Sequence, residues 1–228
     1  MALNLSGAFT ALVTPFRSDG SLDLDALARL VEWQIESGIS GLVPCGSTGE
    51  SATLTPEEHI RVVRHVVEVA SGRVPVVAGT GSNSTREAIE LTAAARSAGA
   101  DGALLISPYY NKPTQEGIYQ HYRMVALEGG LPIVLYNIPG RTASRIESAT
   151  TARLSRVPGV AGLKECGGDF AATAETIQSV APGFAVLSGD DPLTLPLLSI
   201  GASGVISTAS NIAPGPVSDL VRRFAAGD

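Results

Sequence analysis

PIVLYN at residues 132–137 and VAGLK at residues 160–164 are two short apolar runs that each end in a polar side chain. Runs this apolar are typical of parallel strands that are buried on both faces. Six similar runs occur elsewhere, each followed by a stretch with helical patterning, at residues 9–14, 41–44, 74–78, 103–107, 185–188 and 204–207. Eight alternating strand and helix units predict a (β/α)₈ barrel. A doubly wound sheet is the alternative, but no GxGxxG fingerprint supports it.

The segments between the strands carry helix signals. Residues 24–37 and 57–70 are amphipathic, and residues 217–226 are expected to form the last helix. Start signals are found at Thr55-Pro56-Glu57-Glu58, at Ser84-Thr85-Arg86-Glu87 and at Asp191-Pro192. The first combines a cap, a proline at the first helical position and a capping-box glutamate, and the second repeats the capping box. We expect residues 1–228 to form a single domain.

Composition excludes several classes of protein. The 228 residues are 44% hydrophobic and 17% charged, and the net charge of -6 argues against nucleic-acid binding. The sequence contains no apolar run long enough for a membrane helix and no signal peptide at its start, so we expect a cytoplasmic protein. The two cysteines, Cys45 and Cys166, are expected to be small buried residues. The three histidines are scattered, so no metal site is expected.

Barrel enzymes carry their active sites at the carboxyl ends of the strands, and Lys164 ends the sixth predicted strand. Only Lys112 and Lys164 are lysines. A buried ammonium is costly, so Lys164 either pairs with a carboxylate such as Glu165 or Asp190, or acts as an amine nucleophile. At the ordinary pKa of about 10.4, roughly one lysine in a thousand is neutral near pH 7.4, and burial raises that fraction. Because the chain has only two lysines and Lys164 lies at the carboxyl end of a predicted strand, the covalent role is favoured.

Other strand ends supply groups that suit such a lysine. Tyr136 ends the neighbouring strand, and its phenol can donate or accept a proton, although it could simply pack in the barrel mouth. Ser47 and Thr48 lie in a Gly-Ser-Thr-Gly turn that could bind a carboxylate. Arg141 follows the fifth strand and is either a carboxylate ligand or a solvated loop residue. No histidine ends a strand, which excludes a Ser-His-Asp hydrolase.

Five stretches taken together resemble the dihydrodipicolinate synthase and N-acetylneuraminate lyase family of class I aldolases. Their order and spacing are those of the family, and the resemblance covers essentially the whole chain. The stretches are Gly46-Ser47-Thr48-Gly49-Glu50, Ser107-Pro108-Tyr109-Tyr110-Asn111-Lys112-Pro113, Tyr136-Asn137-Ile138-Pro139, Gly162-Leu163-Lys164-Glu165 and Ser188-Gly189-Asp190-Asp191.

The resemblance implies a role for each residue of the catalytic centre. Lys164 would form an imine with pyruvate, and Tyr136 would be the general acid and base. Ser47 or Thr48 would connect Tyr136 to Tyr110 of a neighbouring subunit in a proton relay. The backbone of Ser47 and Thr48 would also hold the pyruvate carboxylate.

Further residues would bind the second substrate. Arg141 would hold its carboxylate, while Gly189 and Ile206 would line the pocket through their backbones. The arginine points to the synthase branch of the family, which condenses pyruvate with L-aspartate-4-semialdehyde. The product, 4-hydroxy-tetrahydrodipicolinate, opens the route to diaminopimelate and lysine. Neither a metal nor an organic cofactor is implied.

Two other functions stay open. One is a different aldolase of the family, acting on N-acetylneuraminate, 2-keto-3-deoxygluconate or 4-hydroxy-2-oxoglutarate. The other is a protein that binds a keto acid without turning it over. Arg141 argues against the first, and turnover would exclude the second.

The sequence also departs from the family pattern. Ser47 stands where synthases commonly have threonine, and Pro56 stands where lysine-sensitive bacterial members often have histidine, which weakens the expectation of feedback inhibition. Family members form a tetramer, and they continue past the position of Asp228 with helices that contribute to it. The resemblance therefore implies a homo-oligomer, either that tetramer or a dimer. The resemblance places a lysine-effector site at Ser51, Ala52, His59, Asn83, Glu87 and Tyr109.

Overall fold

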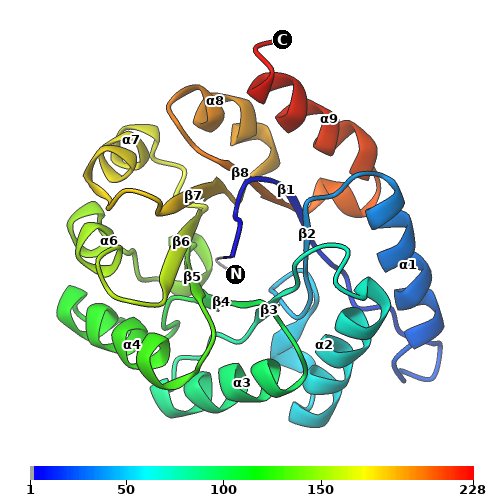
Figure 1. Cartoon of the computed structure of the whole chain (residues 1–228). Helices are drawn as coiled ribbons and strands as arrows, with labels where there is room; N and C mark the ends of the chain where they lie inside the picture. The colour runs from blue at the N-terminus through cyan, green and yellow to red at the C-terminus, as the bar shows by residue number, and fades with distance from the viewer. Residues whose placement is uncertain (1–2) are drawn as a thin grey trace.

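A computed structural model describes residues 3–228 as a ring of parallel strands surrounded by helices (Figure 1). The strands pair in the order β2-β1-β8-β7-β6-β5-β4-β3. A parallel bridge between Leu42 and Val76 joins the two ends of this order, so the barrel closes. The (β/α)₈ prediction is confirmed, and the doubly wound alternative is wrong. The strands are β1 Gly7–Ala11, β2 Gly41–Val43, β3 Val77–Gly79, β4 Gly102–Ile106, β5 Ile133–Asn137, β6 Val160–Glu165, β7 Ala185–Ser188 and β8 Gly204–Ser207.

Helices form the outer layer of the barrel (Figure 1). They are α1 Leu24–Glu36, α2 Pro56–Ala70, α3 Thr85–Ser97, α4 Gln115–Glu128, α5 Pro139–Thr142, α6 Ser148–Leu154, α7 Phe170–Ser179, α8 Thr194–Ser199 and α9 Pro214–Ala225. Short 3₁₀ turns follow three of the strands, at η1 Ser51–Thr53, η2 Asp191–Leu193 and η3 Ala209–Asn211. In the described part of the chain no helix is both long and apolar enough to cross a membrane.

Two predicted strands differ from the observed ones by more than one residue at an end, and four others differ by a single residue at one or both ends. The first was expected at residues 9–14, but β1 ends at Ala11, and the N–H of Val13 donates instead to Asn211 Oδ1 at 3.1 Å. The third was expected at residues 74–78. Pro75 has no N–H to donate, and β3 begins only at Val77.

The helix start signals fared differently. Thr55 forms the predicted capping box, because its hydroxyl accepts from Glu58 N at 3.2 Å and the Glu58 carboxylate accepts from Thr55 N at 2.9 Å. The second predicted capping box is wrong in one half. Ser84 caps Glu87 N at 3.4 Å, but the Glu87 carboxylate accepts from the Ser82 hydroxyl at 2.5 Å instead. The last helix begins at Pro214, three residues before its expected start.

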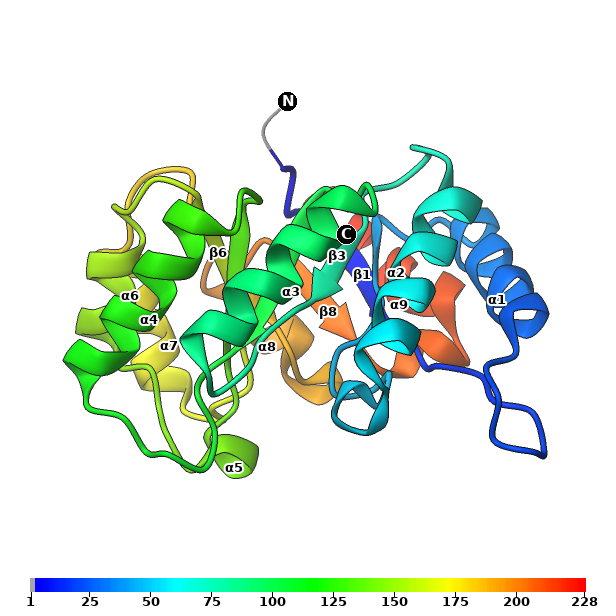
Figure 2. The ribbon, with the colours of Figure 1, turned by 90° about the horizontal axis from the view of Figure 1, so that it is seen from below.

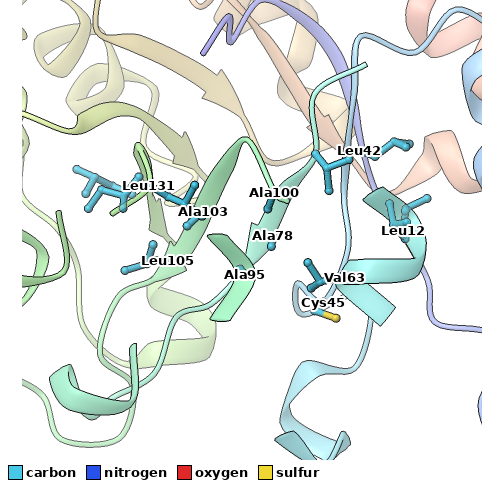
Figure 3. Close-up of a cluster of buried hydrophobic side chains, with 14 of the residues drawn as sticks. Leu12, Leu42, Cys45, Val63, Ala78, Ala95, Ala100, Ala103, Leu105 and Leu131 are labelled. Atoms are coloured by element: carbon cyan, nitrogen blue, oxygen red, sulfur yellow. The ribbon is translucent and has the colours of Figure 1, made fainter. Parts of the chain in front are cut away.

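Strand alternation divides the core into two layers. One lies between the strands and the helices, and Figure 3 shows part of it, with Leu42, Ala103 and Leu105 from the strands, Val63 from α2 and Ala95 from α3. The other fills the barrel and includes Phe9, Val134 and Ile206. Neighbours along a strand belong to different layers, so Leu163 packs outward and Lys164 faces the barrel interior.

Candidate active site

Strand register brings the predicted catalytic residues together at the carboxyl end of the barrel. Tyr136 on β5 is the direct register partner of Lys164 on β6, and Ile106 on β4 is the partner of Tyr136. The short helix α5, which follows β5, lies at the lower edge of Figure 2 and marks this end of the barrel. Its opposite end carries the described start of the chain.

Lys164 is buried without an ion pair in residues 3–228. The residue is only 4% exposed, and its Nζ lies 4.4 Å from the centroid of the Tyr136 ring. Glu165 cannot serve as its partner, because that carboxylate accepts from Asn137 Nδ2 at 2.9 and 3.1 Å and from the N–H of Gly167. The alternative in which Lys164 pairs with Glu165 or Asp190 is therefore wrong for the described residues.

The surroundings hold the pKa of Lys164 below its ordinary value. Burial is the largest cause, because an ammonium loses its hydration there. The Cys166 thiol and the carboxylates of Asp190 and Asp191 act in the opposite direction, and the Arg141 guanidinium acts in the same direction as burial. The net effect increases the fraction of neutral amine, which is the form that attacks a carbonyl.

Tyr136 has the opposite shift. Burial raises the pKa of its phenol, with a further contribution from the neighbouring Cys166 thiol, while the Ser47 hydroxyl and the Arg141 charge lower it by smaller amounts. The residue is 5% exposed. A phenol in this state keeps its proton, so it can donate to a leaving hydroxyl and accept again afterwards.

Gly189 packs directly against the lysine. A Cβ at this position would overlap the Cys166 sulfur and lie 2.8 Å from Lys164 Cε, so the glycine provides the space that both side chains occupy. Cys45 is buried as expected, whereas Cys166 is only partly buried and lies in the site. Ile206 also faces the barrel interior, through a side chain with no exposed surface.

The Gly-Ser-Thr-Gly turn after β2 lies next to the turns that follow β1 and β8. The hydroxyls of Thr48 and Thr208 are 3.3 Å apart, and the Thr14 hydroxyl donates to Gly49 O at 2.7 Å. Ser47 is exposed and Thr48 half-buried, so both can be reached from solvent. The turn therefore offers hydroxyl and backbone groups at the mouth of the barrel.

Arg141 and Tyr110 sit on exposed segments around this mouth. Arg141 lies in α5, is exposed and forms no ion pair among residues 3–228. Tyr110 follows β4, is 88% exposed and has a φ of 71°, in the left-handed region. The structure thus brings Tyr136 and Lys164 into contact but leaves Tyr110 pointing into solvent.

A cavity of about 630 Å³ opens at this end of the barrel and is shared by the two predicted sites. Ser47, Tyr136 and Arg141 line one part of it. The other part is lined by most of the predicted effector residues, namely Ser51, Ala52, His59, Glu87 and Tyr109, together with Pro56.

Two residues of the predicted effector site, His59 and Asn83, form hydrogen bonds with other parts of the chain. His59 Nε2 lies 2.7 Å from Gly79 O, and because a carbonyl only accepts, this nitrogen carries the proton. Burial lowers the pKa of His59. Asn83 is not part of the cavity lining, and its Nδ2 donates to Tyr109 O and Asn111 Oδ1, both at 3.2 Å.

A buried lysine and a buried phenol on adjacent strands at the carboxyl end of a (β/α)₈ barrel define a lyase of the class I aldolase type. Comparison with known proteins narrows this class. Residues 4–228 match the dihydrodipicolinate synthetase family. The chain belongs to this family.

Individual relatives agree closely. A 4-hydroxy-tetrahydrodipicolinate synthase of Nitratidesulfovibrio vulgaris (strain DP4) is 55% identical over 227 residues, which are 99% of this chain and 77% of that protein. Dihydrodipicolinate synthase from Aquifex aeolicus matches with a TM-score of 0.96 and 45% identity, covering 98% of this chain and 76% of that one. A chloride-inhibited dihydrodipicolinate synthase from Acinetobacter baumannii, complexed with pyruvate, has a TM-score of 0.96 and 47% identity, over 99% of this chain and 77% of that one.

Sequence reasoning missed two features of the site. Cys166 was expected to be an ordinary buried residue, yet it follows Lys164 by two positions, and strand alternation alone would have placed it beside the lysine. The contacts of Asp191 with the end of β8 depend on the conformation of two loops, and no sequence signal indicated them.

Proposed function

We propose that this protein condenses pyruvate with L-aspartate-4-semialdehyde through an imine at Lys164 and forms 4-hydroxy-tetrahydrodipicolinate. The observation that carries the proposal is a buried lysine that forms no ion pair among residues 3–228 and whose Nζ lies 4.4 Å from the centroid of the Tyr136 ring. The matched relative from Nitratidesulfovibrio bears the name of this synthase, and the matched Acinetobacter structure holds pyruvate.

Lys164 and Tyr136 would together carry out imine formation, carbon–carbon bond formation and release of the product. The neutral amine of Lys164 adds to the keto carbon of pyruvate, and Tyr136 donates the proton with which the carbinolamine loses water. The Tyr136 phenolate then takes a methyl proton from the imine, which gives an enamine. The enamine carbon attacks the aldehyde of the second substrate, and Tyr136 returns the proton to the resulting alkoxide. The amino group of that substrate then displaces Lys164 from the imine carbon, which closes the ring and frees the lysine.

The two substrates each bring a carboxylate, and the mouth of the barrel offers a separate partner for each. The turn at Ser47 and Thr48 supplies backbone N–H groups and hydroxyls for pyruvate. Arg141 is exposed, forms no ion pair in the described chain and borders the same cavity as Tyr136. Its planar guanidinium suits bidentate binding of the second carboxylate.

The proposal includes a homo-oligomer in which Tyr110 of a neighbouring copy completes the proton relay through Ser47 or Thr48. A tyrosine that is 88% exposed on the rim of the site fits such a contact. Lysine as an effector would occupy the part of the cavity near His59 and Glu87. As a biosynthetic enzyme of this family, the protein would act in the cytoplasm.

A coupled assay that follows the cyclic product tests the proposal. Wild-type protein should form it from pyruvate and aspartate semialdehyde. Arg141→Ala should raise the KM for the semialdehyde about 10- to 100-fold, with a smaller change for pyruvate, because a charge-assisted hydrogen bond contributes about 1.5–3 kcal/mol. Arg145→Ala is the matched control, since Arg145 donates to Gly167 O outside this cavity. Wild-type protein that forms an imine with pyruvate but rejects the semialdehyde would be a different aldolase.

A further inference from the structure

The carboxylate of Asp191 is bound to the turn that follows β8. Its Oδ1 accepts from the hydroxyl of Ser207, and its Oδ2 accepts from Thr208 N at 3.1 Å and Ala209 N at 3.0 Å. Asp191 itself begins η2 after β7. Three donors therefore join the loop after β7 to the loop after β8 through one side chain.

The connection continues toward the predicted substrate site. The Ser207 hydroxyl accepts from Ser210 N at 2.9 Å, which fixes the turn internally. The Thr208 hydroxyl lies 3.3 Å from that of Thr48, in the Gly-Ser-Thr-Gly turn. The path Asp191–Thr208–Thr48 thus links three strand ends around the mouth of the barrel.

Asp190 precedes Asp191 and provides an internal contrast. In the part of the chain that the structure describes, its carboxylate accepts no hydrogen bond. Its backbone is held by the Ser188 hydroxyl at 2.8 and 3.3 Å, and its carbonyl also accepts from Leu193 N at 3.1 Å and the Thr194 hydroxyl at 3.4 Å. Both carboxylates lie close enough to Lys164 to raise its pKa, opposing the effect of burial. The two aspartates share an electrostatic effect but not the contacts with β8.

We infer that Asp191 is a positioning residue that holds Thr208 against Thr48 and so shapes the site for the pyruvate carboxylate. The inference rests on the proposed function, because it takes the Ser47–Thr48 turn to be that site. Both oxygens of Asp191 are already engaged by donors of the chain, so its role is to fix the turn and not to bind substrate. Without an acceptor at this position, the N–H groups of Thr208 and Ala209 lose their hydrogen-bond partner, and the turn is no longer held in this position.

The test compares Asp191→Asn with Asp190→Asn. Asparagine keeps the shape of the side chain, but its Nδ2 donates and cannot accept, so one side of the Asp191 contacts is lost. For Asp191→Asn we expect the KM for pyruvate to rise about tenfold while kcat falls by less than about threefold. For Asp190→Asn the KM should stay within about twofold of wild type. Borohydride trapping at increasing pyruvate concentration gives the same comparison without the second substrate.

The pH profile separates the two effects. The charged and titratable groups that act on Lys164 are Cys166, Asp190, Asp191 and Arg141, and its phenolic neighbour is Tyr136. Each Asp→Asn change removes a negative charge that favours the ammonium, so both variants should move the acid limb of kcat/KM to lower pH. Only Asp191→Asn should also weaken pyruvate binding.

An equal pyruvate KM in the two variants would overturn the inference. If Asp191→Asn does not fold, Ser207→Ala replaces it, because this change removes one donor to Asp191 and keeps the charge. A rise of about threefold in KM would support the inference, and an unchanged KM would overturn it.

Wild-type protein that neither traps nor turns over pyruvate would defeat the proposed function and the inference with it. Normal wild-type turnover with an unaltered Asp191→Asn variant would defeat the inference alone.

Discussion

The end of β6 and the loop between β4 and α4 each carry one of the two lysines, and their surroundings are opposite. Lys164 is 4% exposed, faces the barrel interior and lies over the ring of Tyr136. Lys112 is exposed, in a loop where its own φ is 48°. Burial lowers the pKa of Lys164, which makes the neutral amine accessible. This difference in position, and not the lysine side chain itself, favours Lys164 as the proposed nucleophile.

Loss of the buried amine should have the largest effect. Lys164→Arg keeps a positive charge but cannot form the imine, so kcat should fall by at least about 10³-fold. Lys112→Arg is the matched control and should keep wild-type kcat. Steady-state assays of both variants decide the point, and equal losses would remove the distinction between the two regions.

The phenol beside the buried lysine should come next. Tyr136→Phe keeps the ring against Lys164 but removes the proton donor, and general acid catalysis contributes about 10²–10⁴-fold. We expect a loss of that size in kcat with little change in the KM for pyruvate. Tyr122→Phe is a useful control, because the Tyr122 hydroxyl donates to Leu105 O at 3.1 Å, outside the site. A Tyr136→Phe variant with full activity would contradict the assigned role.

Gly189→Ala tests how tightly the lysine is packed. The new methyl group would overlap the Cys166 sulfur and crowd Lys164 Cε, so the amine must shift. A displacement of about 1 Å can reduce a rate about 10²-fold. Single-turnover imine formation measures this directly, and Gly189→Ala with Cys166→Ala should recover part of the loss. Lack of any recovery would mean that the contact with Cys166 is not the cause.

The pH dependence of imine formation sharpens the comparison. The reactive form of Lys164 is the neutral amine, so the rate should rise as pH increases through the pKa of Lys164. Because burial lowers that pKa, the rise should occur below the ordinary lysine value of about 10.4. Stopped-flow measurement from pH 6 upward, with Lys112→Arg as control, gives the curve. A midpoint at the ordinary value would contradict the account.

The smallest expected effect concerns stability. The unfolded chain protonates Lys164 more readily than the native protein, so burial of this residue costs stability below the ordinary pKa, and the cost disappears as pH rises above about 10.4. Lys164→Met removes the cost at neutral pH. We expect Tm to rise by about 2–4 °C for each kcal/mol gained. Calorimetry should find no comparable change in Lys112→Met, and a lower Tm for Lys164→Met would oppose the argument.

Much of this contrast could be predicted from the sequence. The period of strands and helices indicated the barrel, and the order of the fifth and sixth strands placed Tyr136 beside Lys164. Strand alternation would also have placed Cys166 there. These relations are local or follow from parallel pairing, and a sequence specifies them directly.

Other features depend on contacts between distant loops. The N–H of Val13 donates to Asn211, and the first strand ends before it. The Ser82 hydroxyl donates to the Glu87 carboxylate, which was expected to complete a capping box. Asp191 reaches Thr208 in the same way. Each contact needs a loop conformation that no short motif encodes. For that reason the strand bound and the capping box were predicted wrongly, and the Asp191 contact was not predicted at all.

Borohydride reduction in the presence of pyruvate, followed by peptide mass analysis, is the decisive test of whether Lys164 forms the imine. We expect a stable pyruvate-derived adduct on the peptide that contains Lys164, at the same level in Lys112→Arg and absent from Lys164→Arg. An adduct that persists in Lys164→Arg, or that maps to Lys112, would contradict the assignment of the buried lysine as the nucleophile.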